Sequence, residues 1–240
     1  MNAVQIFVEG SGDVLFLMRL LMRLEPRLIG RWKKCPDGGS LDEGAFQSPI
    51  LTMRAEWNNR LLILRAANGV DNIFPMPESA LQTVCYGVGV ENLTVVKNVF
   101  VVDADDSVRK NGTGGIASAL AKIKDEQAKC AKMHIACAGF AMPDNMSDGT
   151  LESLLAGMVP AANRKVIDCC WHNFEACVAV NGAKFSPPIK SMIDVYAKLF
   201  NKDAHDGMFA SSSFKDASVW DWTAPILDPL KQFLQQEVLS

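Results

Sequence analysis

The chain has 240 residues, of which 49% are hydrophobic and 21% charged, so it can bury a full core as one large domain or as a domain with an extension. The formal net charge of −3 excludes the global basic field of many nucleic-acid-binding proteins, although a metal-dependent nuclease needs only a local basic surface. The seven scattered cysteines, an N-terminus without a signal-type run and the lack of a membrane span together predict reduced thiols and a cytoplasmic location.

The first elements in chain order are a strand, a glycine-rich turn and a helix. Residues 4–8 are apolar and predict a short strand, and the turn that follows reads Glu9-Gly10-Ser11-Gly12-Asp13. Apolar residues then recur at helical spacing, which predicts a helix over 13–24 with Asp13 as its N-cap. This order is the opening of an α/β unit.

The rest of the first 150 residues continues this alternation. The patterns predict strands over 29–35, 61–66, 99–102 and 135–142, and helices over 48–58, 77–86 and 116–133. From residue 151 only helices are predicted, over 151–158, 163–180, 188–200 and 224–238. We therefore expect an α/β core over 1–150, with a mostly parallel sheet flanked by helices, and a helical extension over 151–240 packed on it or continuous with it in one domain.

The most informative stretch is an apolar strand that runs into acids, Val99-Phe100-Val101-Val102-Asp103-Ala104-Asp105-Asp106. Crowded carboxylates at a buried strand's end raise each other's pKa unless a cation or strong donors compensate. In extended backbone Asp103 and Asp105 point to the same side, and Mg²⁺ or Mn²⁺ prefers such oxygen ligands. We therefore expect a metal site at this strand end, with Asp106 facing away.

Two further carboxylates follow other predicted strand ends. Glu9 follows the first strand, and in a parallel sheet its side chain lies on the same edge as Asp103 and Asp105. Three carboxylates on one edge can bind a metal and leave one for acid/base work. Glu152 lies in Thr150-Leu151-Glu152, after the strand predicted over 135–142; alone, Thr150 reads as a helix N-cap and Glu152 as a first-turn acid.

These motifs together resemble the Toprim fold of topoisomerases, bacterial-type primases and OLD-family nucleases. Toprim domains carry a Glu-Gly pair after the first strand and an Asp-x-Asp pair after a later one, which match Glu9-Gly10 and Asp103-Ala104-Asp105. The layout is most similar to a family of small, uncharacterised bacterial and archaeal Toprim-like proteins, whose Pro-Asp-Asn turn and Gly-Thr-Leu-Glu segment match residues 143–145 and 149–152.

The resemblance implies phosphodiester cleavage or other nucleic-acid processing that depends on Mg²⁺ or Mn²⁺. It implies that Asp103 and Asp105 hold the metal, that Glu9 is a ligand or general acid/base, and that Asp13 and Glu152 complete a second metal position. Lys190 is a weak match to the downstream lysine of OLD-like nucleases. A homo-oligomer or a protein partner is compatible with the same pattern.

Other interpretations remain open. A non-catalytic Toprim-like module that binds a nucleotide, a nucleic acid or a protein would carry the same acids. Asp103-Ala104-Asp105 also resembles the nucleophile and general acid of haloacid-dehalogenase-type phosphatases, although that motif normally opens its domain. The basic series Arg19, Arg23, Arg27 and Arg31 recurs every four residues and is either a solvated face or a phosphate-binding surface, with Pro26 ending its helix.

Two other signals are discounted. The cysteines at 169, 170 and 177 and His172 match no common zinc spacing, so we expect mostly buried, unbridged thiols. The two tryptophans of Trp220-Asp221-Trp222 are expected to anchor the C-terminal segment by packing.

Overall fold

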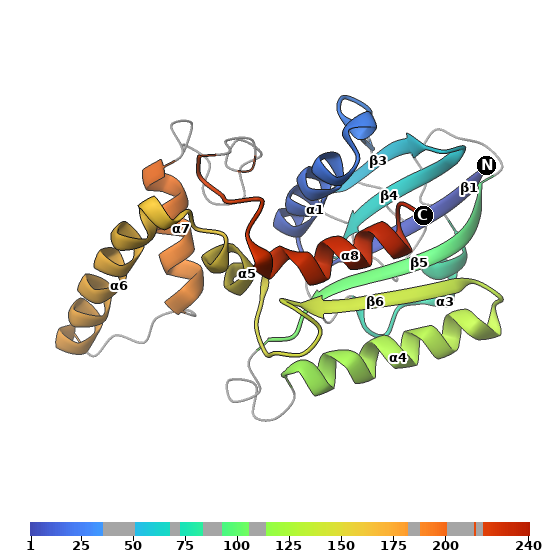
Figure 1. Ribbon diagram of the computed structural model, residues 1–240. Helices are drawn as coiled ribbons and strands as arrows, with labels where there is room; N and C mark the ends of the chain where they lie inside the picture. Colours follow the sequence, from blue (N-terminus) through green and yellow to red (C-terminus); the bar gives the residue numbers. More distant parts are fainter. Residues whose placement is uncertain are drawn as a thin grey trace. The chain divides into compact units, whose positions relative to one another are not determined.

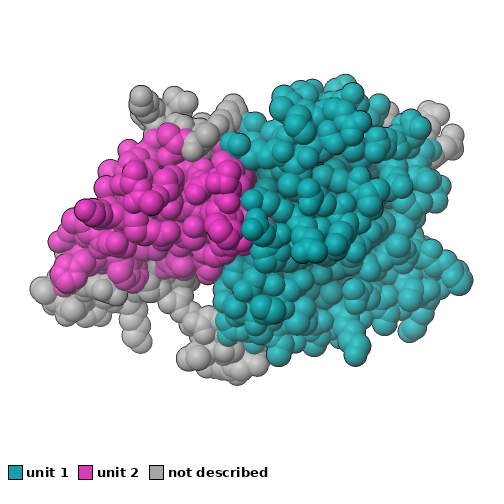
Figure 2. Space-filling model, in the orientation of Figure 1, with its two compact units in different colours: residues 1–150, 228–240 teal, residues 151–227 magenta. Residues whose placement is uncertain are grey.

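The computed structural model of the chain describes residues 1–35, 51–67, 73–83, 93–105, 114–181, 188–200, 214 and 218–240. The prediction for Asp106 lies outside these residues. Contacts divide the chain into two compact units (Figure 2): Met1–Thr150 joined by Asp228–Ser240, and Leu151–Leu227. The first unit therefore includes the C-terminal helix, which the sequence had assigned to the extension.

The first unit is built on one mixed sheet of six strands in the order β2-β3-β4-β1-β5-β6 (Figure 1). The strands are β1 (Asn2–Val8), β2 (Lys33–Lys34), β3 (Thr52–Trp57), β4 (Arg60–Ala66), β5 (Thr94–Asp103) and β6 (Ala136–Met142). Strands β4, β1, β5 and β6 run parallel, whereas β2 and β3 continue the sheet in antiparallel pairing. The expected α/β fold with a mostly parallel sheet is confirmed.

Helices cover both faces of this sheet (Figure 1). One face packs against α3 (Glu78–Gln82) and α4 (Ile116–Lys132), through a core that joins Phe7 and Phe100 to Ile123. The other face carries α1 (Ser11–Leu24) and α8 (Asp228–Glu237), and the ring of Phe233 in α8 lies 5.2 Å from that of Phe140 in β6, tilted by 45°. Burial on both faces explains why β1, β4 and β5 read as nearly continuous apolar runs.

A buried polar network fixes the alignment of the three central strands. Arg65 of β4 donates from Nη1 to Gln5 Oε1 of β1 at 2.8 Å, and Gln5 Nε2 donates to Asn98 Oδ1 of β5 at 3.3 Å. All three side chains are buried, so a slip of one strand would leave polar atoms unpaired in the core. The network therefore supports the register that sets where β1 and β5 end.

The second unit is helical, with α5 (Leu151–Gly157), α6 (Ala161–Asn181) and α7 (Pro188–Phe200). Tyr196 of α7 is buried; its hydroxyl donates to the Val219 carbonyl at 2.7 Å and its ring lies 5.4 Å from Trp220. Burial raises the pKa of Tyr196. Trp220 and Trp222 are both buried, which is the packing role that the sequence predicted.

One predicted element has the wrong type. A helix was expected over 48–58, but β3 occupies Thr52–Trp57 and pairs with β4 through a two-residue turn. Asn58 and Asn59 in this turn have φ of 45° and 59°, the left-handed values that a tight hairpin requires and that asparagine tolerates. In β3 buried residues are spaced irregularly, so the segment lacks the clean alternation that marks a strand.

Other boundaries shift without a change of type. The strand expected over 29–35 is reduced to Lys33–Lys34, and the helix expected from residue 13 already begins at Ser11. The last helix starts at Asp228, after a short 3₁₀ turn over Pro225–Leu227.

Candidate functional site

The carboxyl ends of β1 and β5 bring two of the predicted site residues together. Glu9 directly follows β1, Asp103 ends β5, and the two strands are parallel neighbours with Val8 opposite Val101. The backbone N–H of Asp103 donates to Glu9 Oε1 at 3.0 Å. Two acidic residues 94 positions apart in sequence therefore meet at one edge of the sheet, and both are half-buried.

Asp105 belongs to the same edge but leaves the strand. Its backbone pairs with Gly149 in an isolated bridge, through N–H···O distances of 2.8 Å from Asp105 and 3.0 Å from Gly149. Its φ of 61° lies in the left-handed region, which aspartate tolerates better than most residues. The extended backbone on which the paired geometry of Asp103 and Asp105 was predicted therefore ends at Asp103. We call Glu9, Asp103 and Asp105 the acidic edge.

The loop after β6 holds this bridge in place. Asn145 Oδ1 accepts from the Ala141 N–H at 2.6 Å, and Asp148 Oδ1 accepts from the N–H of Ile116, the first residue of α4, at 2.7 Å. Asp144 is also used structurally: burial raises its pKa, but hydrogen bonds from the backbone of Met146 and Ser147 outweigh this, so its pKa is lowered. The Pro-Asp-Asn motif thus shapes the loop that carries Gly149 to Asp105.

Asp13 has a structural task in the described arrangement. Its Oδ2 accepts from the Gly10 N–H at 2.7 Å, which is the half of a capping box that a glycine N-cap allows at the start of α1. The N-cap is Gly10, so the prediction of Asp13 as N-cap is wrong by three residues. Its role as a metal ligand stays a prediction, and one of its carboxylate oxygens accepts the hydrogen bond from Gly10 at the start of the helix.

The second unit contains the last two predicted site residues, and they pair with each other. Glu152 is buried in the first turn of α5, and its Oε1 lies 3.6 Å from Nζ of Lys190, which is exposed on α7. The weak sequence match at Lys190 is therefore spatially linked to Glu152. Thr150, half-buried, belongs to the first unit and follows the Gly149 bridge directly.

The chemistry of the donors decides whether a metal fits. Among the residues that the structure describes, no group of three or more His, Cys, Asp or Glu side chains forms a metal-binding cluster. The Glu9 carboxylate lies on the backbone N–H of Asp103, and Mg²⁺ is commonly held by one or two carboxylates, with water and substrate phosphate as its other ligands. Binding of Mg²⁺ or Mn²⁺ by Glu9, Asp103 and Asp105 stays a prediction, as does the second metal position with Asp13 and Glu152.

Comparison with known proteins gives a family. The model of the family described as "Protein of unknown function (DUF3226)" matches residues 3–238, nearly the whole chain. The chain belongs to this family. The structure is similar to that of the hypothetical protein PH0156 from Pyrococcus horikoshii OT3, at 17% identity and a TM-score of 0.48, over 100% of this chain and 96% of that one. No curated protein matches the sequence.

The basic series of this DUF3226 chain is divided among different places. Arg19 and Arg23 lie on α1, where burial lowers the pKa of both and the charge of Arg19 lowers that of Arg23 further. The helix ends at Leu24, as Pro26 predicted. Arg27 pairs with Glu25 at 2.8 Å and covers the Trp57 ring at 4.4 Å. No continuous basic stripe is therefore formed.

The expectation of buried thiols in α6 is wrong for Cys169, which is exposed and unbridged. The side chains of Cys170 and Cys177 lie outside the described residues. No helix in the described part of the chain combines the length and the apolar character that crossing a membrane requires.

Proposed function

We propose that the acidic edge binds Mg²⁺ or Mn²⁺ and that the chain cleaves or otherwise processes phosphodiester bonds of nucleic acid there. The observation that carries this proposal is the hydrogen bond from Asp103 N to Glu9 Oε1, which joins the carboxyl ends of two central parallel strands. Open α/β sheets place their ligands at this end of the strands. The resemblance of the motifs to Toprim proteins supports the same reaction class.

Local electrostatics support the binding of a phosphate group at this edge. The first turn of α1 starts at Ser11, two residues after Glu9, and the 14-residue helix directs its N-terminal dipole toward the strand ends. A positive helix end also stabilises the ionised forms of neighbouring carboxylates. The proposed site therefore combines carboxylate ligands for a divalent metal with a positive helix end that favours a phosphate group bound to that metal.

The proposal gives tasks to the bound metal and to Glu9. A bound divalent ion would polarise the scissile phosphate and offset the charge that develops on it. The Asp103 N–H orients Glu9, so that the Glu9 carboxylate is positioned to bind metal or to move a proton. Asp105 is held by its bridge to Gly149. Lys190 and Glu152 belong to the second unit, and their part in the reaction stays a prediction.

A cleavage assay tests the proposal. Purified protein is incubated with plasmid, single-stranded DNA and RNA in Mn²⁺, and wild type is compared with Glu9→Gln and Asp103→Asn. Glutamine at position 9 keeps an oxygen that can accept from Asp103 N, so the fold is retained while the charge is lost. We expect cleavage to fall at least 100-fold in both variants, because each removes a ligand charge.

Asp125→Asn is the matched control, since Asp125 is an exposed acid on α4 away from the acidic edge. Thermal denaturation of all variants separates loss of activity from loss of fold. Metal-dependent cleavage that persists in both Glu9→Gln and Asp103→Asn would contradict the proposed site.

A second candidate is a non-catalytic module that binds nucleic acid, a nucleotide or a protein. It is favoured by the finding that the described residues form no three-member metal cluster. Absence of cleavage from wild type on every substrate, with binding retained, would select this candidate.

A further inference from the structure

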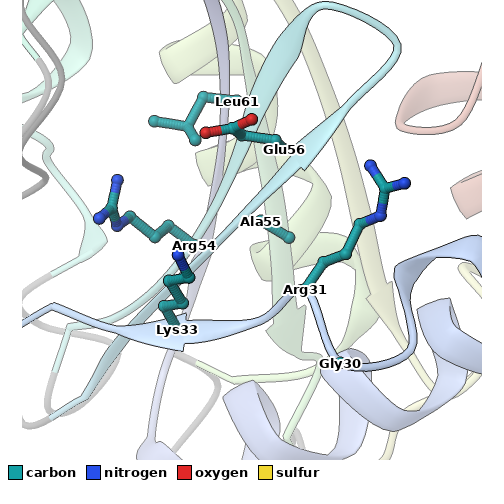
Figure 3. A pocket seen from close by; sticks show the side chains of 7 residues that line it. All are labelled: Gly30, Arg31, Lys33, Arg54, Ala55, Glu56 and Leu61. Atoms are coloured by element: carbon teal, nitrogen blue, oxygen red, sulfur yellow. The ribbon is translucent and has the colours of Figure 1, made fainter.

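A second polar site lies at the hairpin side of the sheet, away from the acidic edge. A pocket of about 310 Å³ is lined by seven residues of the β2–β3–β4 region: Gly30, Arg31, Lys33, Arg54, Ala55, Glu56 and Leu61. Its volume is at the lower end of the range for small-molecule sites. We call it the basic pocket (Figure 3).

Strand pairing brings the polar residues of the pocket together. Lys33 of β2 lies directly opposite Arg54 of β3, so both side chains stand on one face of the sheet, and Glu56 follows on the same face. Figure 3 shows Lys33, Arg54 and Glu56 on one side of the strands, while Arg31 points away from them to form a second wall. Buried Leu61, opposite Glu56, adds an apolar surface.

The turn before β2 depends on glycine. Gly30 has a φ of 76°, a left-handed value that costs most other residues free energy, and a Cβ built there would meet no atom within 4 Å. Glycine is therefore favoured at position 30 by its backbone conformation and not by lack of space, because no atom of the described residues fills the space beside its Cα.

The charges of the pocket are not balanced by the described residues. The lining holds three cationic side chains and one carboxylate, and none of the three cations forms an ion pair or a side-chain hydrogen bond within the described part of the chain. Arg54 Nε is moreover buried and lacks a hydrogen-bond partner there. A buried donor without a partner is costly, and an anion in the pocket would satisfy it.

The basic pocket is separate from the acidic edge. Leu61 of the pocket pairs with Ala3 near the start of β1, whereas Glu9 follows the end of that strand. Six residues of extended chain span about 20 Å. A single phosphate group cannot span this distance, so a ligand of the basic pocket is different from the phosphate proposed at the acidic edge.

We infer that the basic pocket binds a phosphate group carried by a small ligand of mononucleotide size. Lys33 and Arg54 supply the charge-assisted donors, and Arg54 offers the planar fork that suits phosphate oxygens. The Glu56 carboxylate accepts from a donor elsewhere on the ligand, such as a sugar hydroxyl. A nucleotide has both groups, whereas inorganic phosphate has only the first.

Calorimetric titration of the full chain tests this inference, with inorganic phosphate, 5′-AMP and adenosine at low ionic strength. We expect 5′-AMP to bind more tightly than phosphate, and adenosine to show no binding. Lys33→Gln and Arg54→Gln should each weaken 5′-AMP binding about tenfold or more. Lys34→Gln is the matched control: Lys34 is exposed on the same strand but opposite Met53, on the other face, and its variant should bind as wild type.

Four results would overturn the inference, and three of them come from the calorimetric titration. These are no binding of phosphate or 5′-AMP by wild type, equal loss in Lys34→Gln and Lys33→Gln, and binding of adenosine as tight as that of 5′-AMP. The phosphate group could also come from the backbone of a nucleic acid, and an oligonucleotide without terminal phosphate distinguishes this source from a mononucleotide. If wild type binds this oligonucleotide and Arg54→Gln does not, the pocket binds a phosphodiester, which contradicts the inference of a mononucleotide. Asp103→Asn should leave 5′-AMP binding unchanged, so this test stands apart from the cleavage assay.

Discussion

At the scale of single residues, acidic side chains of this chain serve different purposes although they look alike in sequence. Glu9 and Asp103 meet at the strand ends, whereas Asp13 and Asp144 hold backbone N–H groups of a helix start and a loop. The first pair lies at one edge of the sheet because the carboxyl ends of the neighbouring parallel strands β1 and β5 lie side by side. The other two contribute mainly by shaping the backbone around it.

Asp144 gives a pH-dependent prediction. Because its pKa is lowered in the folded state, its contribution to stability is fully present above the unfolded value of about 3.9 and is lost as the pH falls through the folded value. Asp144→Asn should therefore lower the free energy of unfolding at pH 7, by under about 1 kcal/mol because the carboxylate reaches solvent, and have a smaller effect at pH 3. Urea unfolding at both pH values measures this; an equal difference at the two would contradict it.

At the scale of elements, strand ends and amphipathic helices could be predicted from local pattern. Strands β1, β4, β5 and β6 and helix α4 occupy the expected places, and with parallel pairing they imply the juxtaposition of Glu9 and Asp103. The basic pocket, in contrast, has no local sequence pattern that predicts it. Lys33 and Arg54 are 21 positions apart and meet only because β2 and β3 pair, and β3 had been interpreted as helix.

One signal could have corrected the prediction for β3. Asn58-Asn59 precedes a strand, and two residues that tolerate positive φ between extended segments favour a tight hairpin. Neither the bridge of Asp105 to Gly149 nor the pairing of Glu152 with Lys190 has such a local signal, because both depend on tertiary packing.

The hairpin between β3 and β4 yields a stability prediction. Asn59→Val should destabilise the fold by about 1–2 kcal/mol, because a β-branched residue resists the positive φ at this position. Asn59→Gly should be nearly neutral or stabilising, since glycine adopts this conformation freely. The midpoint of urea unfolding measures both variants, and equal destabilisation by valine and glycine would contradict the role of φ.

At the scale of the whole molecule, opposite charges collect at opposite ends of the first unit's sheet. The acidic edge lies at the carboxyl ends of β1 and β5, and the basic pocket lies near the start of β1. The net charge of −3 conceals this separation, which explains why composition alone gave no indication of a phosphate-binding surface. The chain thus has one proposed site for a cation and another for an anion.

The central claim is that Glu9 and Asp103 bind a divalent metal, and Mn²⁺ titration followed by electron paramagnetic resonance tests it most directly. Wild type should bind Mn²⁺ saturably and so reduce the resonance signal of free Mn²⁺. Added Mg²⁺ should compete for the same site and restore that signal. Glu9→Gln and Asp103→Asn should each weaken Mn²⁺ binding at least tenfold, while Asp125→Asn binds as wild type. Mn²⁺ binding that is unchanged in both acidic-edge variants, or absent from folded wild type, would contradict the account.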